Sequence, residues 1–235
     1  MSTSDNIASI RQRIESAAKR AGRKPEDIAL MAVAKTHPPE RIRQAYAAGI
    51  RWFGENRVQE WARKAGTLQD LPEARWHMIG HLQSNKASNA VALFDAIDSV
   101  DSVKLAEKLH AAAQNQNKKI AALIEVNVGG EQAKNGVAPD SQDLEALLLS
   151  APRFEALEFH GLMTVPPFTD DAQGSRPYFR RLREIRDTIA RRKLPGISME
   201  VLSMGMSHDF EVAVEEGSTC VRVGTAIFGK RPQPR

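Results

Sequence analysis

The sequence predicts an α/β protein built as one (β/α)8 TIM barrel with an extra amino-terminal helix. Two observations favour this fold: short apolar runs alternate with longer amphipathic stretches, and the 235 residues contain eight such runs. A doubly wound open sheet is the main alternative, but no Gly-x-Gly-x-x-Gly turn follows the first run. The expected strands are residues 28–36, 51–56, 75–81, 95–100, 120–128, 157–165, 198–205 and 220–229.

The first expected strand, IALMAVAKT, is an unbroken apolar run that ends on a single lysine just before two prolines. Such a short bounded run is typical of a strand buried on both faces, with Lys35 at its carboxyl end. Side chains alternate along a strand, so Met31, Val33 and Lys35 are expected on one face and Ala32 and Ala34 on the other.

Amphipathic helices are expected between the strands, because apolar residues recur three or four positions apart in these segments. Pro39 suits the first turn of a helix, and Asp140 or Ser141 suits an N-cap. Residues 7–21 are expected to form the extra leading helix.

Composition favours one cytoplasmic domain that spans residues 1–235. The chain has 42% hydrophobic residues, a single cysteine and a polar opening segment without a secretory signal. No run approaches the length of a membrane span. The net charge of +4 argues only weakly for a nucleic-acid partner. We therefore expect neither a nucleic-acid nor a membrane partner, and our overall interpretation is a monomer.

The carboxyl ends of the strands are where this kind of barrel places its chemistry. Lys35 is expected there, together with short polar residues and glycines that end the other strands. Turns use Gly, Asn and Ser in any case, so each of these residues alone has a structural explanation.

The last two strand ends carry a more specific pattern, LSMGMSHDFEVAVEEG followed by VRVGTAIFG. Gly205 permits an unusual backbone path, and Ser207 is expected to cap a helix that begins near His208. Gly224 allows close approach to a ligand, and Thr225 supplies a hydroxyl and an amide. Loops after strands seven and eight commonly bind phosphate, so a phosphorylated carbonyl compound held by Lys35 as a Schiff base is predicted.

Several blocks of the sequence resemble the pyridoxal phosphate homeostasis proteins, which are single-barrel relatives of the alanine racemase N-terminal domain. The blocks are MAVAKTHP, FGENRVQE, WHMIGHLQSNK, HGLMTVPP and SMGMSHDFEVAVEEGSTCVRVGTAIFG, and they cover nearly the whole chain in order. The resemblance implies that the cofactor is pyridoxal 5'-phosphate (PLP).

The resemblance also implies roles for individual residues. Lys35 would carry the Schiff base, and Ser207, Gly224 and Thr225 would hold the phosphate. Arg222, which strand alternation also points inward, would approach the pyridine nitrogen. The implied cofactor-binding set is Lys35, Asn56, Met206, Ser207, Arg222, Gly224 and Thr225, with no catalytic residue.

The implied function is PLP binding for intracellular vitamin B6 homeostasis, with PLP-dependent apoenzymes as the candidate protein partners. The alternative is an amino-acid racemase or a related PLP enzyme. A guanidinium near the pyridine nitrogen cannot accept its proton and weakens the electron sink. Alanine racemases also use a tyrosine as second base, whereas Tyr46 and Tyr178 fall in expected helices here. We therefore predict a non-catalytic protein.

For the other polar residues the sequence gives weaker evidence of a functional role. His81 and His160 are expected beside the pocket without a catalytic role. Lys134, in the loop after strand five, is either a second cofactor contact or part of a solvated loop, and the solvated loop is preferred. The basic helix 179–193 has an apolar stripe, so its charges are expected on the outer face of the barrel. No metal-ligand pattern is apparent.

Overall fold

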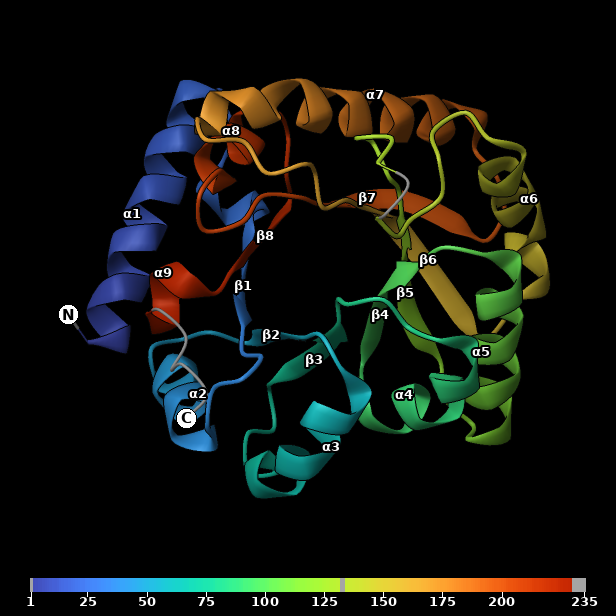
Figure 1. The fold of residues 1–235 in the computed structure, drawn as a ribbon, viewed down its shortest axis with the longest axis horizontal. Coiled ribbons are helices and arrows are strands. Elements are labelled where there is room, and N and C mark those ends of the chain that lie inside the picture. Colours follow the sequence, from blue (N-terminus) through green and yellow to red (C-terminus); the bar gives the residue numbers. More distant parts are fainter. Residues whose placement is uncertain (1, 132–133, 230–235) are drawn as a thin grey trace.

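A closed barrel of parallel strands forms the centre of the protein (Figure 1). The computed structural model describes residues 2–131 and 134–229. The strands pair in chain order and β1 closes the ring against β8. They are β1 Ala29–Val33, β2 Trp52–Glu55, β3 Arg75–Met78, β4 Ala96–Val100, β5 Ile120–Glu125, β6 Leu157–Met163, β7 Ile197–Ser203 and β8 Cys220–Val223. The predicted fold is confirmed.

Helices surround the barrel and cover its outer face (Figure 1). They are α1 Thr3–Arg20, α2 Pro39–Ala47, α3 Val58–Ala65, α4 Ala87–Leu93, α5 Val103–Asn115, α6 Gln142–Ser150, α7 Arg176–Arg192, α8 Phe210–Glu215 and α9 Thr225–Phe228. Short 3-10 helices lie at Pro25–Asp27, Gly66–Leu68, Ser84–Lys86, Ala151–Arg153 and Ala172–Ser175.

The extra helix α1 packs outside the ring against α8 and α9 (Figure 1). It begins earlier than predicted, because Ser2 and Asp5 form a capping box in which each side chain bonds the other's backbone amide. Ile7, Ile10 and Ile14 face the barrel and are buried. Burial of this apolar stripe holds α1 in place.

The sequence correctly predicted where two helices, α2 and α6, begin. Pro39 occupies the first turn of α2, where its missing amide hydrogen is not needed. Ser141 caps α6 by accepting a hydrogen bond from the amide of Leu144 over 3.1 Å. In both cases a local side-chain property decides where the helix begins.

Most of the strands are shorter than predicted, chiefly at their carboxyl ends. The largest error concerns residues 220–229, because β8 ends at Val223 and residues 225–228 form α9. An apolar run does not distinguish a strand from a short buried helix, and Gly224 divides this run. The shortened strands leave loop residues at the carboxyl mouth of the barrel.

Among the described residues, no helix combines the length and apolar character needed to cross a bilayer.

Candidate functional site

Lys35 lies in a tight turn just beyond β1 rather than in the strand itself. The turn is closed by a hydrogen bond of 3.2 Å from the amide of His37 to the carbonyl of Ala34. Thr36 has a φ of 65°, which ends the extended backbone. The predicted strand 28–36 is therefore too long, and the turn carries the partly exposed lysine at the mouth.

The phosphate cup predicted after strands seven and eight has a defined geometry. The Ser207 Oγ atom accepts hydrogen bonds from the amides of Gly224, over 3.3 Å, and Ala226, over 3.2 Å. Thr225 lies between these two residues at the start of α9 and is exposed. Two backbone amides therefore converge on the Ser207 hydroxyl where the loops after β7 and β8 meet.

Ser207 does not cap α8, contrary to the sequence prediction. The N-cap position belongs to Asp209, whose Oδ1 atom accepts a hydrogen bond from the amide of Met206 over 2.7 Å. Gly205 adopts a φ of 96°, as its predicted unusual path requires. The Ser207 hydroxyl instead faces the amides of Gly224 and Ala226, at the start of α9.

The Lys35 turn and the phosphate cup are neighbours. β1 pairs with β8, and the Val33 Cβ atom lies 3.4 Å from the position that a Cβ atom on Gly224 would occupy. The rings of His37 and Phe228 are in contact, with centroids 4.6 Å apart. The amine-bearing turn and the amides of the cup thus share one side of the mouth.

Arg222 points into the barrel, as strand alternation predicted, and is only 3% exposed. Its guanidinium donates to the Ser203 Oγ atom over 2.7 Å and to the carbonyl of Thr164 over 2.7 Å. These partners come from β7 and from the end of β6. The guanidinium is therefore fixed beneath the mouth with both terminal nitrogens held.

Glu125 was missed by the sequence analysis. It ends β5, is 7% exposed, and its Oε2 atom has no hydrogen-bond partner among the described residues. Burial, and to a lesser extent the negative charge of Asp101, raises the pKa of Glu125 to about 7, while the positive charge of Arg222 opposes the shift. A lone glutamate in the apolar run IAALIEVNV was the available signal.

Asn56 and Met206 lie at the mouth in different ways. Asn56 follows β2, and its carbonyl would be 2.3 Å from a Cβ atom on Gly80, so only glycine fits there. Met206 is half-buried beside Ser207, with its amide bonded to Asp209. Both residues lie in loops that follow the carboxyl ends of strands, as predicted.

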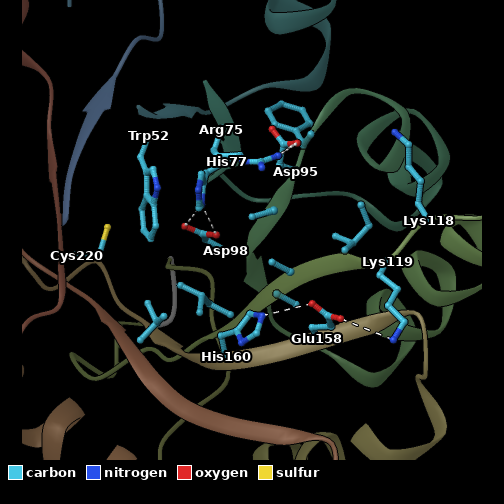
Figure 2. A pocket seen from close by; sticks show the side chains of 17 residues that line it. Trp52, Arg75, His77, Asp95, Asp98, Lys118, Lys119, Glu158, His160 and Cys220 are labelled. Carbon is cyan, nitrogen blue, oxygen red and sulfur yellow. Dashed lines mark hydrogen bonds and ion pairs between the residues drawn. The ribbon is translucent and has the colours of Figure 1, made fainter. Parts of the chain in front are cut away.

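His160 lies away from the mouth, contrary to the prediction. It lines a cavity of about 600 Å³ at the amino end of the barrel, together with Trp52, His77, Asp98 and Cys220 (Figure 2). There His77 Nδ1 lies 3.1 Å from an Asp98 oxygen (Figure 2). The error arose because His160 belongs to the middle of β6, not to its carboxyl end.

The remaining candidates take structural positions. His81 is exposed after β3, with Nδ1 3.4 Å from Asp101. Lys134 forms an ion pair with Glu131 and donates to the carbonyl of Pro166 over 3.1 Å, so it links the loops after β5 and β6. Residues 132 and 133 of that loop are outside the described residues. In the ranges 2–131 and 134–229, no cluster of three or more acidic, histidine or cysteine side chains suggests a metal site.

The arginines of α7 are largely engaged in ion pairs. The helix buries Phe179, Leu182 and Ile189 against the barrel. Glu216 forms ion pairs with three arginines, Arg176, Arg180 and Arg183. Burial acts to raise the pKa of Glu216, but hydrogen bonds from Arg180 and Arg176 outweigh it, so the pKa is lowered and the carboxylate stays ionised. The basic run therefore has intramolecular partners on the outer face of the barrel.

Comparison with known proteins identifies the family. The model of the alanine racemase N-terminal domain matches residues 6–232. A pyridoxal phosphate homeostasis protein of Aquifex aeolicus is 44% identical over 232 residues, covering 98% of this chain and 99% of that protein. The chain belongs to the pyridoxal phosphate homeostasis protein family. Family members of Pseudomonas aeruginosa and Homo sapiens are 41% and 37% identical, covering 98% and 96% of this chain and 97% and 85% of their own lengths.

Solved structures agree with this placement. PipY of Synechococcus elongatus, determined with PLP bound, is 38% identical and has a TM-score of 0.83, with 97% of this chain and 100% of that chain covered. An alanine racemase of Clostridium difficile is 15% identical with a TM-score of 0.72, and the match covers 97% of this chain and 58% of that chain. The racemase likeness concerns the fold of the barrel.

Proposed function

We propose that this homeostasis-family protein binds PLP covalently through Lys35 and serves intracellular vitamin B6 homeostasis without strong catalytic activity. The observation that carries the proposal is the adjacency of the Lys35 turn to the cup formed by Ser207, Gly224 and Ala226. An aldehyde and a phosphate on one small molecule need such a pair of sites. The PLP-bound structure of PipY supports the same ligand.

The residues of the mouth fit the chemical groups of PLP. The Ser207 and Thr225 hydroxyls would donate to phosphate oxygens, and so would the amides of Gly224 and Ala226 once the phosphate replaced Ser207 Oγ as their acceptor. Lys35 offers an amine for the Schiff base. Asn56 and Met206 would border the ring.

Arg222 is proposed to face the pyridine nitrogen. When bound, PLP supplies an aldehyde that condenses with amines and a ring that withdraws electrons. A guanidinium remains protonated, so it would donate to the ring nitrogen and would give it no proton. Its bonds to Ser203 and Thr164 keep it in this orientation. The ring would then be a weak electron sink, which favours binding over carbanion chemistry.

The racemase alternative requires a second acid-base group opposite Lys35. Tyr46 and Tyr178 lie in α2 and α7, outside the barrel. Cys220 is at the amino end of β8, and burial raises the pKa of its thiol to about 12. Neither residue type is therefore placed at the mouth within the described ranges, which favours the carrier function.

We further propose that the protein is a cytoplasmic monomer that exchanges PLP with apoenzymes.

Borohydride trapping tests the proposal. The purified protein is loaded with PLP, reduced with borohydride and digested, and the modified peptide is identified by mass spectrometry. We expect stoichiometric modification of Lys35 in the wild type, none in Lys35→Ala, and full modification in the control Lys134→Ala. The turn lies above the packed core, so Lys35→Ala should fold normally. Stoichiometric trapping by Lys35→Ala would overturn the assignment.

A further inference from the structure

A second lysine lies directly behind the Lys35 turn. Lys64, near the end of α3, has a side chain that is only 13% exposed. Its ammonium donates to the carbonyl of Ala34 over 3.0 Å and to that of His37 over 3.3 Å. These two carbonyls flank Lys35 on both sides. Lys64 therefore joins the beginning and the end of the turn that carries the proposed Schiff-base lysine.

The third interaction of Lys64 balances its charge. Its Nζ atom lies 2.7 Å from Oε1 of Glu55, a residue at the end of β2 with no exposed surface. Neither carboxylate oxygen of Glu55 has a hydrogen-bond partner among the described residues, so the contact with Lys64 is an ion pair. A buried carboxylate and a nearly buried ammonium are each costly in isolation, so the two are retained as a pair.

The turn needs this support because its backbone is strained. Thr36 has a φ of 65°, in the left-handed region that β-branched residues rarely adopt. The hydrogen bond from the amide of His37 to the carbonyl of Ala34 closes the turn, and Lys64 adds a donor to the carbonyl at each end of it. A strained conformation persists only where the surrounding structure fixes it, and such strain is concentrated at functional sites.

A plain structural role for Lys64 is the competing explanation. An ion pair between α3 and β2 would need only Glu55. Both of the hydrogen bonds that the Lys64 ammonium makes within the described residues go instead to the carbonyls around Lys35. The arrangement thus directs these hydrogen bonds to a single turn, while Glu55 supplies the opposite charge.

We propose that Lys64 is a positioning residue that holds the strained turn so that the amine of Lys35 is presented to the carbonyl carbon of the cofactor. The inference rests on the proposed function. The Lys64 ammonium takes no part in bond formation and acts through the backbone of residues 34–37. Removing it would slow covalent capture and leave non-covalent binding of the phosphate unchanged.

The test compares two ligands in cofactor-free protein. Capture of PLP is followed by absorbance and borohydride trapping, and binding of pyridoxine 5'-phosphate, which has no aldehyde, is measured by calorimetry. The variants are Lys64→Met, the double variant Lys64→Met/Glu55→Gln, and the control Arg63→Met, an exposed neighbour on α3. Circular dichroism and thermal melting establish that each variant is folded. The double variant avoids an unpaired buried carboxylate, so it remains informative if the single variant does not fold.

We expect the rate of covalent PLP capture by the folded Lys64 variants to fall by about tenfold or more, because a misplaced reacting group loses the advantage of orientation. Their affinity for pyridoxine 5'-phosphate should be unchanged, and amide exchange should increase at Thr36 and His37. Arg63→Met should match the wild type. Capture at the wild-type rate by the double variant would overturn the inference, as would an equal loss of affinity for pyridoxine 5'-phosphate. Failure of the wild type to trap PLP would instead overturn the proposed function.

Discussion

Arg222 on β8 and Ser203 on β7 are joined inside the barrel by a hydrogen bond of 2.7 Å from the guanidinium to the hydroxyl. The same guanidinium reaches the carbonyl of Thr164 at the end of β6. One side chain therefore connects three successive strands beneath the proposed cofactor. The hydrogen bonds that hold these strands together therefore also fix the position of the guanidinium beneath the mouth.

Arg222→Met should destabilise the cofactor-free protein by roughly 2 to 4 kcal/mol. The substitution leaves the Ser203 hydroxyl and the Thr164 carbonyl without their buried donor, and it removes the cation that faces Glu125. Urea unfolding followed by circular dichroism measures the change. Arg57→Met is the control, because its ion pair with Glu60 is largely exposed and should contribute less than about 1 kcal/mol. Equal stability of the two variants would contradict this account.

Ser207→Ala and Thr225→Ala should each weaken PLP retention. A hydrogen bond to a charged group contributes roughly 1.5 to 3 kcal/mol, which corresponds to about ten- to a hundredfold in the dissociation constant. Equilibrium dialysis measures the change, with exposed Ser88→Ala on α4 as the control. Pyridoxal, which has no phosphate, should bind the wild type weakly and should be insensitive to both cup substitutions. Equal wild-type affinities for pyridoxal and PLP would exclude the cup.

Glu125 should make the cofactor-free protein less stable as the pH rises. Its folded pKa of about 7 is above the usual value of 4.5, so the folded state binds the proton more tightly than the unfolded state. Stability is then retained below about pH 4.5, falls as the pH rises to about 7 and is constant above that, with a total loss of roughly 3 kcal/mol.

Urea unfolding of Glu125→Gln between pH 5 and pH 8 checks this prediction. The amide cannot ionise, so the fall in stability across that range should be smaller than in the wild type. Glu26→Gln is the matched control, because Glu26 is exposed. If Glu125→Gln and the wild type show the same dependence on pH, Glu125 is not the titrating group.

The PLP-loaded protein should not racemise amino acids at a useful rate. One face of the substrate would meet Lys35, and no tyrosine or cysteine of the described ranges stands opposite it. Single enantiomers of alanine and serine are incubated in deuterium oxide, and both α-deuteration and the opposite enantiomer are measured. Slow deuteration with retained configuration is compatible with one working base. Rapid, Lys35-dependent formation of the opposite enantiomer would favour the racemase function.

The amino-acid sequence determined the alternation of strands and helices, because burial on both faces produces apolar runs and amphipathic packing produces helical periodicity. It also indicated that Lys35, Ser207 and Gly224 lie close to the carboxyl mouth of the barrel, because the ends of parallel strands meet there. The inward direction of Arg222 followed from the period of two along β8. These features depend on short-range patterns, which a single chain displays directly.

Only the tertiary structure decided which distant residues act on those positions. Nothing near Lys64 in the sequence shows that its ammonium reaches the carbonyls of Ala34 and His37, some thirty residues earlier. The raised pKa of Glu125 depends on burial by neighbouring strands. The prediction placed His160 at the wrong end of the barrel, because its level in the barrel is set by strand register. Local periodicity gives the direction of a side chain, whereas burial, register and long-range contacts arise when the barrel closes and so determine its chemical environment.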